Sequence, residues 1–167
     1  KYVDFVVNRQ HSAWDWTQAE QHGKWIESAY LSAVQGDDKE LLIKAESVLN
    51  RIIDSQEANG YVGATAKSFR SPERPVRGMD AYELYFVFHA FITVYEETGD
   101  KKALTAAEKL ADYFLQYFGP GKLEFWPSDL RAPENKQKHL DGHSDFAGHS
   151  VHYSWEGTLL CDPITRL

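Results

Sequence analysis

The chain has 167 residues and a formal net charge of −7, and 26% of its residues are charged. That length is enough for one ordinary domain. The acidic charge, with no clustering of lysine and arginine, excludes nucleic acid as an expected partner. No apolar run approaches the ~20 residues that cross a bilayer, so no membrane span is expected. The one cysteine, Cys161, cannot form an intrachain disulfide.

Apolar residues recur at helical spacing and begin with a pair of helices, predicted over about 17–34 and 38–55. Thr17 and Glu20 form a capping box at the start of the first helix. Gly36 is expected to end that helix in the left-handed conformation that glycine readily adopts. The second helix carries one continuous apolar stripe and stops before Asn59 and Gly60.

The same pair then recurs. Helices are predicted from Asp80 to near Gly99 and from Asp100 to near Gly119. Matched positions, Gly36 and Gly99 among them, are 63 apart in the first helices and 62 apart in the second helices. Such a register indicates a repeat of helical hairpins. A further helix is predicted to begin near Ser150 and to be still running at Leu167, with a kink at Pro163.

The connections differ in length. The turns within each pair are short, whereas the loops between pairs, 57–79 and 119–148, are long. If neighbouring helices are antiparallel, all long loops lie at one end of the bundle. The first, third and fifth helices begin at that same end, where free backbone N–H groups and positive dipole ends suit polar ligands. The functional site is therefore predicted at the long-loop end.

This pattern predicts an all-α fold, an (α/α)6 toroid with the first, third and fifth helices inside and the second and fourth outside. An open α-solenoid would have a shorter period, about 34 to 47 residues. A closed toroid needs six hairpins, and the chain provides about two and a half. Residues 1–167 are thus expected to form the N-terminal portion of a single toroid domain, a fragment of a longer enzyme.

Several polar residues fall near the predicted site end. Capping accounts for Glu20, while His22 is either a hydrogen-bonded structural residue or a substrate contact. Glu83 lies near the start of the third helix, and Tyr85 and His89 share one face of it. The same two interpretations apply to His89.

The stretch 141–155 holds three of the seven histidines and two aspartates. Imidazole and carboxylate suit zinc, but the spacing matches no His-Glu-x-x-His motif. A polar, sugar-binding helix start fits better, with His149 and His152 supplying hydrogen bonds and Trp155 a stacking face. In the first long loop, Arg70, Arg74 and Arg77 are either solvated or able to bind an acidic sugar.

Five short motifs together resemble the β-L-arabinofuranosidase family, glycoside hydrolase family 127. In chain order they are His22-Gly23-Lys24-Trp25-Ile26-Glu27, Asn59-Gly60-Tyr61-Val62-Gly63, Glu83-Leu84-Tyr85 followed by His89, Thr98-Gly99-Asp100-Lys101, and Gly148-His149-Ser150-Val151. The resemblance covers most of the chain from about Trp14 onward. It implies an (α/α)6 toroid that hydrolyses terminal sugars of plant-type or related glycans with retention.

The resemblance also implies a cysteine nucleophile in a cysteine/glutamate zinc site and a glutamate acid/base, all farther along the chain. Cys161 lacks the cysteine cluster, so no catalytic residue is assigned and no cofactor is expected in this segment. The resemblance allows a zinc site only in the missing part. His89 and His149 match histidines that contact the sugar in the family. The full set of expected substrate-binding residues is His22, Glu83, Tyr85, His89, His149, His152 and Trp155.

The expected partner is an oligosaccharide or glycoside. A polysaccharide substrate favours a periplasmic or secreted protein, and the sequence gives no indication of oligomeric state. Two other functions stay open. One is another toroid enzyme, such as an unsaturated-glucuronyl hydrolase, a polysaccharide lyase or a sugar epimerase, in which the arginine loop binds a uronate. The other is a non-catalytic helical-repeat scaffold.

Overall fold

The computed structural model describes residues 2–9, 19–73, 75–76, 80–122 and 160–167. These residues form helices and contain no β-strand, as predicted. In chain order the elements are α1 (Tyr2–Val7), α2 (Ala19–Gly36), α3 (Lys39–Asp54), the 3-10 turn η1 (Lys67–Phe69), α4 (Asp80–Thr98), α5 (Lys101–Tyr117) and α8 (Cys161–Arg166). Within the part of the chain described, none of the helices combines the length and apolarity that crossing a bilayer requires.

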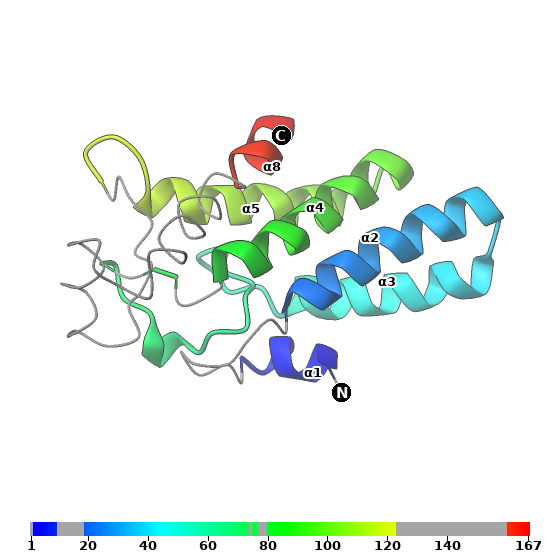
Figure 1. The fold of residues 1–167 in the computed structure, drawn as a ribbon, viewed down its shortest axis with the longest axis horizontal. Helices are drawn as coiled ribbons and strands as arrows, with labels where there is room; N and C mark the ends of the chain where they lie inside the picture. Colours follow the sequence, from blue (N-terminus) through cyan, green and yellow to red (C-terminus); the bar gives the residue numbers. More distant parts are fainter. Residues whose placement is uncertain (1, 10–18, 74, 77–79, 123–159) are drawn as a thin grey trace, which may run out of the picture.

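Two antiparallel hairpins, α2–α3 and α4–α5, make up the body of the fold (Figure 1). The most extensive helix–helix contact joins α2 to α4, whereas α3 and α5 touch only marginally. This is the arrangement predicted for inner and outer helices. The segments 57–73 and 75–76 lie at the end opposite the short turn between α2 and α3, where α2 and α4 begin (Figure 1). The first long loop therefore lies at the predicted end.

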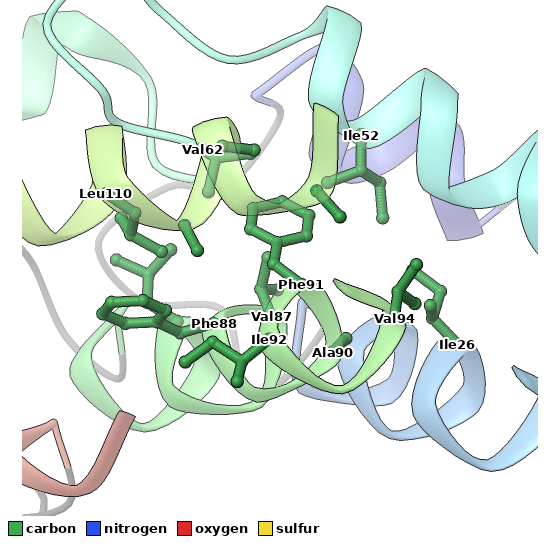
Figure 2. Packing of buried hydrophobic residues seen from close by; sticks show 14 of the residues in the cluster. Ile26, Ile52, Val62, Val87, Phe88, Ala90, Phe91, Ile92, Val94 and Leu110 are labelled. Atoms are coloured by element: carbon green, nitrogen blue, oxygen red, sulfur yellow. The ribbon is translucent and has the colours of Figure 1, made fainter. Parts of the chain in front are cut away.

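The centre of the core is α4. The outer helices α3 and α5 are strongly amphipathic, but α4 is apolar around most of its circumference, as suits a helix with neighbours on several sides. Figure 2 shows Phe88 and Phe91 of α4 packed among apolar side chains of the neighbouring elements. Those neighbours include Ile26 of α2, Ile52 of α3, Val62 of the long loop and Leu110 of α5.

One glycine permits the close approach of the two inner helices. A β-carbon on Gly23 of α2 would lie 2.3 Å from the backbone carbon of Phe86 in α4. No side chain can occupy that space unless the helices move apart. The contact between α2 and α4 thus depends on the absence of a side chain at this position.

Aspartates cap both outer helices. The side chain of Asp38 accepts a hydrogen bond from the Leu41 amide at 3.0 Å, and that of Asp100 accepts one from the Lys102 amide at 2.8 Å. Each carboxylate satisfies an N–H group that has no partner within its helix and lies at the positive end of the helix dipole. The starts predicted at these two aspartates are confirmed.

The end predicted for the first helix is wrong in detail. Gly36 is the last helical residue, and Asp37 takes the left-handed conformation with φ of 49°. The Asp38 amide then donates to the Ala33 carbonyl at 2.9 Å, which closes the turn as a Schellman motif. In the second hairpin the left-handed residue is Gly99, with φ of 74°. The structural counterpart of Gly99 is therefore Asp37, not Gly36, and aspartate tolerates this conformation better than most residues do.

The two short terminal helices differ from expectation. Helix α1 was not predicted; it packs against α3, where Asp4 forms an ion pair with Arg51. At the other end, Leu160 lies in a turn and α8 runs only from Cys161 to Arg166, so the helix predicted to be still running at Leu167 is wrong over 160–167. The start predicted near Ser150 lies outside the described residues. Pro163 lies in the first turn of α8, where backbone N–H groups have no partner within the helix. It therefore fits the helix start and is not the site of a kink in a longer helix.

Candidate functional site

The candidate site is built around the beginnings of α2 and α4, which contain buried polar side chains in an otherwise apolar core. Glu83 is fully buried, and Glu20 and His22 are nearly so. Buried carboxylates are rare in proteins because ionised groups lose hydration. Glu20 and Glu83 are 63 residues apart, so the repeat places a buried carboxyl at matching positions of both inner helices.

The carboxylate of Glu20 forms an ion pair with Lys24, one turn later in α2. The Lys24 ammonium lies 4.2 Å from the centre of the Phe86 ring in α4, a cation–π contact. Farther along the same helix pair, the Thr93 hydroxyl donates to the Glu27 carboxylate at 2.9 Å. Polar contacts thus supplement the apolar packing between the inner helices. The Thr17 half of the predicted capping box lies outside the described residues.

His89 lies near the middle of α4, two to three turns after the start of that helix at Asp80, and contacts α8. Its Nε2 is 2.7 Å from the Asp162 carboxylate, and its Nδ1 is 2.9 Å from Nη1 of Arg166. A guanidinium can only donate, so Nδ1 accepts, and the proton on Nε2 is donated to Asp162. The network continues from Arg166 to Glu96 on α4. Both ring nitrogens of His89 are engaged, and its side chain is 15% exposed.

Tyr85 lies beside His89 on the same face of α4, as the spacing predicted. The two rings meet edge to face, with centroids 4.5 Å apart. Burial, together with the nearby charges of Asp162 and Glu27, raises the pKa of the Tyr85 phenol above its usual value. The phenol therefore stays protonated at neutral pH and can donate a hydrogen bond.

The network of Asp162, Arg166 and Glu96 was not anticipated from the sequence. Asp162 and Arg166 are four residues apart and so lie on one face of α8, a spacing that could have been noticed. Their partner His89 is 73 residues from Asp162, and no local pattern indicates that contact.

The first long loop is fastened by two arginines that share one carboxylate. Glu57 forms ion pairs with Arg9, whose Nε is 2.8 Å from it, and with Arg70. Arg70 also donates to the Thr65 carbonyl at 3.1 Å, and its guanidinium stacks 3.6 Å from the centre of the Tyr61 ring. The side chain of Arg70 is only 5% exposed. The interpretation of Arg70 as a solvated residue is therefore wrong, and its guanidinium is engaged by Glu57, Thr65 and Tyr61.

The loop is also tied to the second hairpin. The Tyr61 and Tyr113 rings lie 5.4 Å apart, and the Tyr113 hydroxyl donates to the Pro75 carbonyl. The Gln56 amide donates to the Ala106 carbonyl of α5 at 3.0 Å. This part of the long-loop end is therefore held in place against α5.

Comparison with known proteins agrees with this geometry. The family model described as β-L-arabinofuranosidase, GH127 catalytic domain, matches residues 5–126. The chain belongs to glycoside hydrolase family 127. A curated relative, the non-reducing end β-L-arabinofuranosidase of Bifidobacterium longum subsp. longum, is 29% identical over 104 residues, which are 58% of this chain and 16% of the relative.

Two solved family 127 structures share the fold. A β-L-arabinofuranosidase from Geobacillus stearothermophilus T6 superposes with a TM-score of 0.59 at 18% identity, over 91% of this chain and 26% of its own. A second, a family 127 β-arabinofuranosidase, superposes with a TM-score of 0.58 at 22% identity, over 91% of this chain and 27% of its own. The chain thus spans about a quarter or less of these relatives, and the two hairpins are part of an (α/α) toroid.

The zinc site that the family resemblance implies does not fit the described residues. Among them, no group of three or more His, Cys, Asp or Glu side chains lies close enough to hold a metal ion. Cys161 is exposed at the start of α8. We therefore assign no step of the reaction through zinc to this part of the family 127 chain.

Five other residues of interest lie outside the described residues, and nothing in the structure bears on their predicted roles. They are Arg74, Arg77, His149, His152 and Trp155.

Proposed function

We propose that this chain forms the sugar-binding wall of a glycoside hydrolase that removes terminal β-L-arabinofuranosyl residues from plant-type or related glycans. The observation that carries the proposal is the match of the family 127 catalytic-domain model to residues 5–126. The name of the Bifidobacterium relative supports the choice of sugar and of a non-reducing end.

Within the described residues, Tyr85 and His89 are the proposed sugar contacts that are partly open to solvent. A protonated phenol and an imidazole can hydrogen-bond sugar hydroxyls, and the edge of the aromatic pair offers apolar surface to a sugar ring. Glu83 and His22 are closed to solvent, and we propose that they shape the wall from behind. His149, His152 and Trp155 are proposed to complete it.

Glycoside hydrolysis normally needs two positioned groups that flank the scissile bond. In the described part of the chain, both carboxylates of the His89 network are engaged: Asp162 by His89 itself and Glu96 by Arg166. We therefore place the nucleophile and the acid/base, with any zinc, outside this segment. The burial of Arg70 removes one of the three groups on which the uronate alternative relied.

The test is hydrolysis of p-nitrophenyl β-L-arabinofuranoside by the intact gene product, with the α-L-arabinofuranoside and a glucuronide for comparison. We expect turnover of the β-L substrate and a KM raised about 10-fold by His89→Ala, because a lost hydrogen bond in a binding site costs roughly this factor. Glu97→Gln, exposed near the far end of α4, is the matched control and should leave KM unchanged. A folded protein that hydrolyses no arabinofuranoside would contradict the proposal.

A further inference from the structure

Helix α8 covers His89 in a way that consumes all the hydrogen-bonding capacity of its ring. An imidazole has two nitrogens, and each makes one hydrogen bond in the plane of the ring. Here Nε2 is bonded to Asp162 and Nδ1 to Arg166, both from α8. A sugar hydroxyl can therefore bond to His89 only if it displaces one of these partners.

The attachment of α8 is weak enough to be displaced. The helix has six residues, whereas isolated helices need about 12–15 to be even marginally stable, so its order depends on docking. Among the described helices its main contact is with α4. Pro163 is buried, and Ile164 packs against the apolar core. The two α8 side chains that bond to His89 are accessible to solvent: the Asp162 side chain is 57% exposed and the Arg166 side chain is 30% exposed. Elements of this kind open at low free-energy cost.

We propose that α8 is a latch that competes with the sugar for His89. In the closed state, Asp162 and Arg166 are bonded to the two ring nitrogens of His89. When α8 is released, both nitrogens become available to sugar hydroxyls. Tyr85 and Glu96, the other groups of α4 in this cluster, do not occupy a ring nitrogen. This inference rests on the proposed function, since it assumes that the sugar binds at His89.

The first experiment is calorimetric titration of the intact gene product with L-arabinose. A latch that is closed in most molecules raises the apparent Kd by the reciprocal of the open fraction. We expect the double variant Asp162→Asn, Arg166→Met to bind about 5-fold more tightly, which is the scale of an exposed ion-pair network. Thr165→Val is the matched control: Thr165 is exposed on the same helix, its hydroxyl donates to the backbone carbonyl of Asp162, and its replacement should change nothing.

The second measurement is hydrogen exchange of the wild-type protein with and without saturating L-arabinose. Competition predicts faster exchange of the amides of 161–167 when sugar is bound, because the sugar displaces the helix. A helix that merely supports the binding site would exchange more slowly or unchanged.

The outcomes separate the latch from the proposed function. If binding needs His89 but the double variant binds no more tightly, or exchange in α8 slows, the latch is wrong and the sugar position stands. If no variant binds sugar, or binding is indifferent to His89→Ala, both the sugar position and the latch are wrong. Tighter binding in the double variant, abolished by adding His89→Ala, together with faster exchange in α8, supports the latch.

Discussion

The two hairpins share a helical register but not an environment. Trp25 in α2 and Phe88 in α4 are 63 residues apart and occupy matching positions of the repeat. Trp25 is 43% exposed, whereas Phe88 is 0% exposed. Each helix contacts three others among the described residues, α4 with α2, α5 and α8, and α2 with α1, α3 and α4. The exposure of Trp25 therefore marks a side of α2 that these three neighbours leave uncovered. A repeat therefore specifies a helix pair locally, and its place in the array decides which side chains become core.

The largest expected contrast lies at this matched pair. Phe88→Ala should lower the free energy of unfolding by about 3–5 kcal/mol, because it removes a buried ring and leaves a cavity. Trp25→Ala should cost less than about 1 kcal/mol if its face is as open in the intact protein. Urea denaturation followed by circular dichroism measures both. Equal costs would show that α2 is covered as fully as α4 and would end the distinction between the hairpins.

A second contrast concerns two glycines of α2. Gly23→Ala should destabilise the protein by about 1–3 kcal/mol, because the new methyl group would overlap the Phe86 backbone. Gly36→Ala is the matched control. Gly36 is helical, has no atom near the position of an added β-carbon, and its replacement should stabilise the helix by about 0.5–1 kcal/mol. Thermal unfolding should therefore show a lower Tm for Gly23→Ala and a higher Tm for Gly36→Ala. A Gly23→Ala variant with an unchanged Tm would contradict the close crossing of α2 and α4.

The smallest contrast compares the two short turns. Gly99→Ala forces a side chain into a left-handed residue and should cost about 1–2 kcal/mol. Asp37→Gly relieves the same conformation in the first turn and should be neutral or stabilising by a few tenths of a kcal/mol. Thermal unfolding of the two variants resolves the difference. Destabilisation by Asp37→Gly greater than that by Gly99→Ala would mean that the turns are not equivalent.

Local signals predicted most of the fold. The stripes of α3 and α5 and the caps Asp38 and Asp100 each act within a few turns, so the helices follow from the local sequence. The 62-residue spacing of the outer helices repeats this pattern along the chain and so predicts their pairing and the inner and outer layers. The turn at Gly36 failed because glycine and aspartate can both adopt the left-handed conformation, and the pattern does not say which one does.

The site depends on contacts between distant parts of the chain and was only partly predictable. The face shared by Tyr85 and His89 follows from helical spacing. Helical spacing does not predict that both nitrogens of His89 bond to Asp162 and Arg166. It also does not predict the burial of Arg70 against Tyr61 and Glu57. In each case the deciding partner comes from another element, and only the assembled fold reveals it.

The most direct test of the central claim, that the starts of the inner helices form a sugar-binding wall, is a crystal structure of the intact gene product with L-arabinose. We predict a furanose at the end of the bundle where α2 and α4 begin, with a hydroxyl within hydrogen-bonding distance of His89 and the sugar against the Tyr85 ring. A sugar bound at the short-turn end, or away from α4 altogether, would contradict the account.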